Sequence, residues 1–202
     1  MRRVTCSSKE LHKIPEDVPV VGTLGELKEL KGQREFVIAA AEVIRAVPDC
    51  RFVIVGVDNT VDKRFRRELK RLAGVSGLGE KILWLDWLDD TAGFYSAIDV
   101  FVSPSRSESF GLAILEAMAH GKAIVATETD GAKELIADCG VMVPVNEPVT
   151  LANEVSRLLD DRDEMVRIGL HAKQIASIEY SLDRMIDETE ALYGRIIGGD
   201  PV

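Results

Sequence analysis

The sequence predicts an α/β fold: a Rossmann-like, doubly wound parallel sheet of about six strands, with helices on both faces and a helical C-terminal tail. Three observations predict it. Short apolar runs rich in β-branched residues alternate with longer segments of helical period, as in consecutive βαβ units. The strand candidates are largely apolar, which is typical of strands that are buried on both faces. Near residue 148 the strand pattern stops, and only helical periodicity follows.

Six segments have the length and composition of buried strands. They are PVVGTL (19–24), RFVIVGV (51–57), KILWL (81–85), DVFVSPS (99–105), AIVAT (123–127) and GVMVPV (140–145). Between them we predict helices near residues 33–46, 61–73, 91–97, 111–120 and 132–137. Gly121 is the residue expected just past the end of the fourth helix. Three further helices are expected after residue 148.

The 202 residues suit one α/β domain, which can bury about 70% of its unfolded surface. We divide the chain into a lead-in (1–18), a Rossmann-like domain (19–180) and a C-terminal helix (181–202). In that helix, apolar or small residues recur at helical spacing: Leu182, Met185, Ile186, Thr189, Leu192, Tyr193 and Ile196. This stripe either lies partly exposed for a partner or packs against its own domain.

Composition argues against several classes of protein. A formal net charge of -9 and a sequence pI near 4.9 disfavour nucleic-acid binding, which depends on basic patches. The cysteines, Cys6, Cys50 and Cys139, form no C-x-x-C pattern, so neither a disulfide framework nor a zinc site is expected. This cysteine usage favours the cytoplasm. Because no apolar run approaches the ~18–20 residues that span a bilayer, we expect at most peripheral contact with a membrane.

Familiar nucleotide and metal motifs are missing from the sequence. There is no G-x-x-x-x-G-K-[ST] loop, and no G-x-G-x-x-G follows the first strand. The Gly-rich segment 74–81 precedes a strand instead of opening a helix, which disfavours NAD. Asp161 and Asp163 form an Asp-x-Asp in a junction between tail helices, far from any strand end. We therefore expect no cofactor and no metal.

Two glutamates, Glu108 and Glu116, stand eight positions apart in an otherwise apolar stretch. Glu108 follows the strand 99–105, at the edge of the sheet where ligands bind, and Glu116 lies in the next helix. Gly111 lets a ligand approach the backbone, and the free N–H groups of a helix start suit phosphate. Carboxylates accept hydrogen bonds from sugar hydroxyls, so the set fits a nucleotide sugar. Alternatively, Glu108 caps the helix and Glu116 only faces solvent.

The stretch 103–127, SPSRSESFGLAILEAMAHGKAIVAT, resembles the E-x7-E signature of the retaining glycosyltransferases of family 4, or group 1, which have the two-domain GT-B fold. VGTLGELKELKG (21–32) resembles the family's first strand and phosphate loop, and the likeness extends over roughly residues 19–197. It implies the donor-binding half of an enzyme that moves a hexose from a UDP-, GDP- or ADP-sugar to an acceptor hydroxyl with retention. The acceptor would be a carbohydrate or a lipid-linked sugar.

The resemblance also implies roles for single residues. Glu108 would contact the donor sugar, Glu116 the ribose, and Lys31 would neutralise the departing diphosphate. Substrate contacts are also implied for Gly25, for the amides of Phe110, Gly111 and Leu112, and for the base-binding residues Trp87 and Leu88. Alternatively, Trp87 is an ordinary residue of the hydrophobic core.

Some features depart from the family. Glu26 stands where the first loop usually has an arginine, and Asp86 where the base loop usually has glycine. A carboxylate at Glu26 would repel a diphosphate. Either Lys31 with the helix dipole suffices, or turnover is weak, or another basic residue such as Lys28 or Arg34 substitutes. The resemblance implies that only the donor half is present in this sequence, and that the last helix would cross to an acceptor-binding N-terminal domain. There are two alternatives. One is a non-catalytic nucleotide-sugar-binding module or subunit, and the other is a sugar-nucleotide epimerase of the same architecture.

Overall fold

The computed structural model describes residues 14–15 and 17–198, so most of the predicted lead-in, with Cys6 and His12, and residues 199–202 lie outside the described part. Six parallel strands form one sheet in the order β3-β2-β1-β4-β5-β6. Their bounds are β1 Val20–Leu24, β2 Arg51–Val55, β3 Ile82–Leu85, β4 Val100–Ser103, β5 Ala123–Thr127 and β6 Val141–Val143. The predicted doubly wound sheet is confirmed. Its strand order reverses between β1 and β4, where a ligand crevice is expected.

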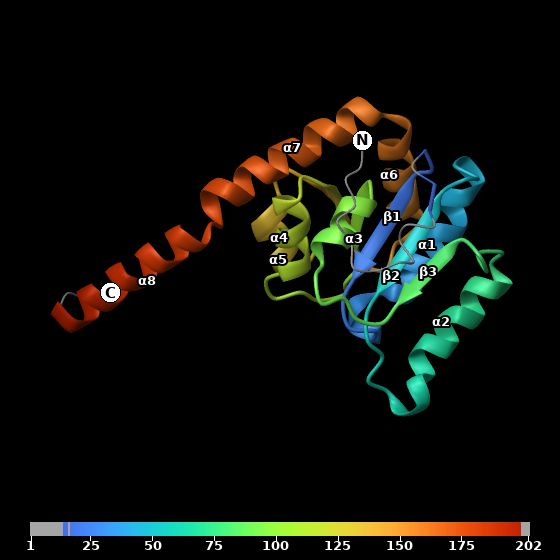
Figure 1. Cartoon of the computed structure of the whole chain (residues 1–202), viewed down its shortest axis with the longest axis horizontal. Helices are drawn as coiled ribbons and strands as arrows, with labels where there is room; N and C mark the ends of the chain where they lie inside the picture. The colour runs from blue at the N-terminus through green and yellow to red at the C-terminus, as the bar shows by residue number, and fades with distance from the viewer. Residues whose placement is uncertain (1–13, 16, 199–202) are drawn as a thin grey trace.

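The helices cover the two faces of the sheet as two separate hydrophobic clusters. The first cluster contains side chains of α1 (Gln33–Ala46), α2 (Arg64–Val75) and α6 (Pro148–Asp160). The second contains side chains of α3 (Ala92–Ala97), α4 (Leu112–Ala119), α5 (Asp130–Ile136) and α7 (Arg162–Glu179). Successive side chains of a strand point to opposite faces of the sheet, so one strand contributes to both clusters. In β2, Phe52 and Ile54 belong to the first cluster, and Val53 and Val55 belong to the second. In Figure 1, α3, α4 and α5 lie on one side of the sheet and α1 and α2 on the other.

Three strands end two residues earlier than predicted. β2 stops at Val55, β4 at Ser103 and β6 at Val143. Pro104 and Pro144 follow the latter two strands, and proline cannot donate to the ladder. Predicted helix 61–73 starts as a 3-10 turn, η3 (Val61–Lys63), before α2. Pro104 and Ser105, which were predicted to lie in the fourth strand, belong instead to a loop at the carboxyl edge of the sheet.

The last helix, α8 (Leu182–Gly198), leads away from the body of the molecule (Figure 1). None of its residues is buried. Of the predicted stripe, Leu182, Met185, Ile186, Tyr193 and Ile196 are exposed. The stripe therefore does not pack into the core of its own domain, which leaves the exposed alternative.

Two loops interlock at the carboxyl edge: the loop after β1, which contains the 3-10 turn η2 (Glu29–Lys31), and the loop after β4. The amide of Arg106 donates to the carbonyl of Leu30 (2.8 Å), and its guanidinium donates to the buried carboxylate of Glu35 (2.6 Å). The hydrogen bond to Glu35, with its charge, raises the pKa of Arg106. At Gly32 (φ 67°), a Cβ would lie 1.9 Å from the carbonyl oxygen of Pro104. Only glycine fits between these two loops.

We predict that Gly32→Ala destabilises the protein by at least roughly 1–3 kcal/mol, because the left-handed conformation alone costs that much and the clash with Pro104 adds to it. Gly74→Ala is the matched control. Gly74 lies in α2, where an added Cβ would meet nothing within 4 Å, so alanine should stabilise by up to about 1 kcal/mol. Urea unfolding followed by circular dichroism measures both. Equal stability of the two variants would contradict the interlock.

Candidate functional site

A hollow of about 380 Å³ lies at the carboxyl ends of β1 and β4. Its walls come from the loop after β1, the loop after β4 and the first turns of α4. Seven predicted site residues line it: Gly25, Lys31, Glu108, Phe110, Gly111, Leu112 and Glu116. Residues 77 positions apart in the chain, Lys31 and Glu108, thus meet at the switch point of the sheet.

Lys31 and Glu108 form an ion pair across the hollow, with side chains only 25% and 17% exposed. The hydroxyl of Ser105 lies 3.5 Å from the same oxygen of Glu108. The backbone carbonyl of Glu108 accepts a hydrogen bond from the amide of Gly131 in α5 (3.0 Å), which fixes the loop from its other side. Partial burial strengthens the attraction between the two charges relative to water.

The start of α4 opens into the hollow. Its N-cap is Gly111, at φ 97°, and no side chain caps the helix. The prediction that Glu108 caps this helix is therefore wrong; its carboxylate pairs with Lys31 instead. An uncapped helix start presents backbone N–H groups and a partial positive charge, which together favour an anion.

Glu116 lies one turn into α4 and is exposed, as its solvent-facing alternative requires, yet it also borders the hollow. One of its carboxylate oxygens accepts a hydrogen bond from the hydroxyl of Thr91 (3.2 Å). Thr91 is the residue just before α3, so the segment that follows β3 reaches the second predicted carboxylate.

The predicted base-binding residues do not line the hollow. Trp87 is 74% exposed, so its alternative as a core residue is wrong. Leu88 is half-buried against the second hydrophobic cluster. Asp86, in the same loop, is held by an ion pair with the buried Arg66, whose guanidinium also donates to the carbonyls of Leu85 (2.8 Å) and Gly56 (3.3 Å).

Sequence reasoning missed Arg66, which joins α2 to the carboxyl ends of β2 and β3. Phe65 and Leu69 of the same helix are buried, so Arg66 stands next to the apolar stripe and could be taken for a surface residue. Gln33 was also missed. It is buried, and its side-chain amide donates to the carbonyl of Glu26 (2.9 Å), which holds the loop after β1. No local pattern marks it.

Glu26 lies on the rim of the hollow, and its carboxylate bonds to Lys28 (2.6 Å) and Asn59 (3.1 Å). The hydrogen bond from Lys28 is the main cause of the lowered pKa of Glu26. Arg34 pairs with Glu29 and Glu68. Neither Lys28 nor Arg34 lines the hollow, so neither replaces the missing arginine in this arrangement. Among the residues that line the hollow, Lys31 is the one lysine or arginine.

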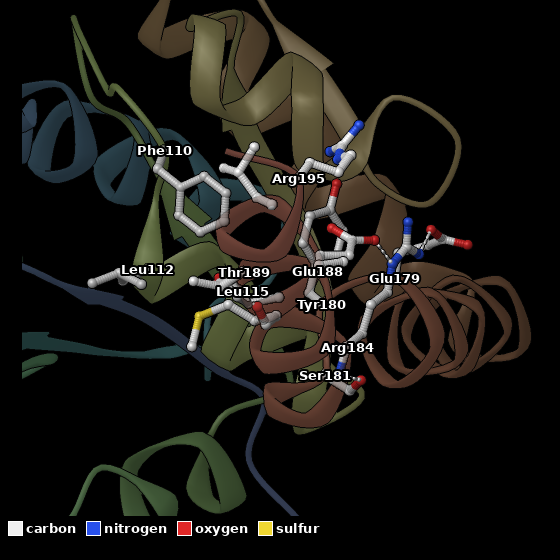
Figure 2. A pocket seen from close by; sticks show the side chains of 13 residues that line it. Phe110, Leu112, Leu115, Glu179, Tyr180, Ser181, Arg184, Glu188, Thr189 and Arg195 are labelled. Atoms are coloured by element: carbon white, nitrogen blue, oxygen red, sulfur yellow. Dashed lines mark hydrogen bonds and ion pairs between the residues drawn. The ribbon is translucent and has the colours of Figure 1, made fainter. Parts of the chain in front are cut away.

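A larger groove of about 860 Å³ runs between the start of α4 and α8 (Figure 2). It shares Phe110 and Leu112 with the hollow, and the ring of Phe110 meets that of Tyr180 edge-on (centroids 6.2 Å apart). Its Arg184 is paired with Glu179 and Glu188. No strand end reaches this groove, so the smaller hollow remains the candidate site.

Within the described part of the chain, no group of three or more His, Cys, Asp or Glu side chains could hold a metal ion. Among the same residues, no helix has both the length and the apolar character needed to cross a bilayer.

Comparisons with known proteins agree on one family. The family model for the group 1 glycosyl transferases matches residues 18–161. Alpha-D-kanosaminyltransferase of Streptomyces kanamyceticus is 32% identical over 185 residues, covering 90% of this chain and 47% of that enzyme. D-inositol 3-phosphate glycosyltransferase of Corynebacterium urealyticum is 31% identical over 197 residues, covering 95% of this chain and 46% of that enzyme.

Solved structures share the fold. Sucrose-phosphate synthase from Thermosynechococcus elongatus superposes with a TM-score of 0.85 at 27% identity, over 95% of this chain and 48% of that one. Anabaena HepE, crystallised with UDP and glucose, gives a TM-score of 0.80 at 28% identity, over 87% of this chain and 48% of that one. The C-terminal domain of LpcC, a group 1 glycosyl transferase of Francisella tularensis, gives 0.78 at 28% identity, over 86% of this chain and 91% of that domain.

The chain spans about half the length of the curated relatives that it matches. Its sheet and helices have the architecture of the C-terminal half of GT-B glycosyltransferases. Because the family model covers most of the chain and the relatives align along nearly all of it, this chain belongs to the group 1 glycosyl transferases.

Proposed function

We propose that this chain is the donor-binding half of a retaining glycosyltransferase of family 4, which transfers a hexose from a nucleoside diphosphate sugar to an acceptor hydroxyl. The observation that carries the proposal is the Lys31–Glu108 ion pair beside the uncapped start of α4, with Glu116 on the same hollow. Relatives support the donor class, because Anabaena HepE was crystallised with UDP and glucose, and also with UDP-glucose.

The charges of the hollow fit the parts of such a donor. The diphosphate would lie between the ammonium of Lys31 and the free N–H groups at the start of α4, the two positive features here. Amides of Phe110, Gly111 and Leu112 and the backbone at Gly25 would contact the phosphates or the sugar. Trp87 and Leu88 would meet the base, from the loop that follows β3.

Catalysis would depend on stabilising the leaving group. As the glycosidic bond breaks, the nucleoside diphosphate gains negative charge, and a cation already in place stabilises that charge without reorganisation. Lys31 is the residue for this role. Glu108 holds its ammonium in the hollow and would accept hydrogen bonds from hydroxyls of the transferred sugar. Glu116 would accept hydrogen bonds from the ribose.

The acceptor, a carbohydrate or a lipid-linked sugar, would be bound by an N-terminal half outside this chain. The exposed stripe of α8 supports such a partner, because contiguous exposed apolar side chains mark interaction surfaces. We identify this partner as the N-terminal half because the chain spans about half the length of its relatives. A cytoplasmic location, with peripheral contact at a membrane for a lipid-linked acceptor, completes the proposal.

A non-catalytic nucleotide-sugar-binding module is the second candidate, and Glu26 favours it. Glu26, Glu108 and Glu116 line the hollow with Lys31, so three carboxylates face one ammonium, a formal charge of -2. This balance opposes a diphosphate, although Lys28 partly neutralises Glu26. A module that binds its ligand without turning it over would tolerate the weaker stabilisation of the leaving group.

We predict that Glu116→Ala weakens nucleotide-sugar binding at least tenfold, because a hydrogen bond to a charged group is worth about 1.5–3 kcal/mol and alanine offers no acceptor. Calorimetry with UDP, GDP and ADP and their glucose and mannose conjugates, without metal and then with magnesium, measures the affinity. Glu80→Ala is the control, since Glu80 is exposed and precedes β3 at the opposite edge of the sheet. Equal losses in both variants would contradict the role of Glu116.

We predict that a fusion of this chain to the N-terminal half of the Corynebacterium D-inositol 3-phosphate glycosyltransferase transfers sugar. Lys31→Met should lower its turnover roughly 100- to 1,000-fold, as loss of a single charge-stabilising group does in other enzymes. The relative's own two halves, joined at the same point, serve as the control. A fusion that binds donor but transfers nothing, while the control transfers, would favour the binding module.

A further inference from the structure

Two hydroxyl side chains at α3 bond to α4: Thr91, just before α3, and Tyr95, within it. Thr91 and Tyr95 lie one turn apart on the same face, because the amide of Tyr95 donates to the carbonyl of Thr91 (3.1 Å). Thr91 donates to the carboxylate of Glu116 (3.2 Å). Tyr95 is fully buried, although it carries a polar group.

Tyr95 contacts α4 on both sides of Glu116. Its hydroxyl donates to the carbonyl of Ala113 (3.0 Å), three residues before Glu116. Its ring stacks on that of His120, four residues after Glu116, with centroids 5.1 Å apart and planes inclined by 13°. One phenol therefore spans the two turns of α4 in which Glu116 lies.

The surroundings of Tyr95 allow it little freedom. The rings of Phe94 and Phe101 meet it at centroid distances of 5.0 and 5.7 Å. Burial raises the pKa of Tyr95, and the charge of Glu116 raises it further, so the phenol stays a hydrogen-bond donor. Burial, followed by the charge of Lys122, lowers the pKa of His120, which favours a neutral ring in the stack. Packing and hydrogen bonding thus hold Tyr95 against α4.

We propose that Thr91 and Tyr95 are positioning residues for the ribose-binding carboxylate of Glu116. Tyr95 sets the position of α4 against α3, and Thr91 sets the orientation of the Glu116 side chain. The proposal rests on the proposed function, in which Glu116 accepts hydrogen bonds from the ribose. Thr91 ends the loop that begins after β3 and contains Trp87 and Leu88. The hydroxyl of Thr91 thus connects the loop that carries the proposed base contacts to Glu116, the proposed ribose contact.

The test measures discrimination for the ribose, which a change in overall stability does not alter. Whichever of UDP, GDP and ADP binds most tightly is compared by calorimetry with its 2′,3′-dideoxy counterpart. We expect Thr91→Val and Tyr95→Phe each to lower the affinity ratio roughly three- to tenfold, about the worth of one hydrogen bond. Thr91→Ser should restore the ratio. Ser96→Ala is the control, because its hydroxyl bonds within α3 to Ala92 (2.8 Å).

The same substitutions are then made in Glu116→Ala, where no acceptor is left to position, so they should have no further effect on the ratio. If Thr91→Val and Tyr95→Phe keep the wild-type ratio, or lower it equally in both backgrounds, the positioning role is overturned while the proposed function stands. If Glu116→Ala itself keeps the full ratio, or if no nucleotide binds, the proposed function fails and this proposal fails with it. Thr91→Val alters a half-buried residue at a helix start, so it keeps the test valid should Tyr95→Phe unfold.

Discussion

The ion pair between Lys31 and Glu108 is the contact on which the candidate site depends. It joins loops that follow two neighbouring strands, β1 and β4, at the point where the strand order reverses. Each side chain is more than two-thirds buried, so each charge needs the other. The surrounding backbone enforces the pairing, since Gly32 lies against Pro104 and the amide of Arg106 bonds to Leu30. Scaffold and site are thus built from the same loops.

The electrostatics of the hollow are unusual for a site that takes a diphosphate. Its one lysine is already paired, and Glu26 adds a negative charge on the rim. In the proposed function, backbone N–H groups at the uncapped start of α4 would be the main neutral donors to phosphate, and they need no counter-charge. The proposed ligand would offset this negative balance by engaging Glu108 and Glu116 through hydroxyl groups as well as Lys31 through phosphate. A sugar nucleotide has both kinds of group.

The sequence predicted the features that depend on local pattern. All six strands, and the meeting of Glu108 and Glu116 at one crevice, followed from periodicity and from the rule for parallel sheets. Side-chain contacts that depend on how the chain folds back on itself could not be predicted, because no local pattern encodes them. They include the pairing of Arg66 with Asp86, the hydrogen bond from Gln33 to Glu26, and the stacking of Tyr95 on His120. Trp87 shows the same limit, since its exposure depends on how its loop leaves β3.

The central claim is that the hollow at β1 and β4, and not the larger groove beside α8, binds the nucleotide sugar. Amide chemical-shift mapping of the nitrogen-15-labelled chain, titrated with UDP, GDP and ADP in turn, tests this most directly. The account predicts saturable shifts for one nucleotide at the amides of Lys31, Gly32 and residues 108–113, with α8 unchanged. Shifts confined to the groove residues from Glu179 to Arg195, or no saturable shift with any of the three, would contradict it.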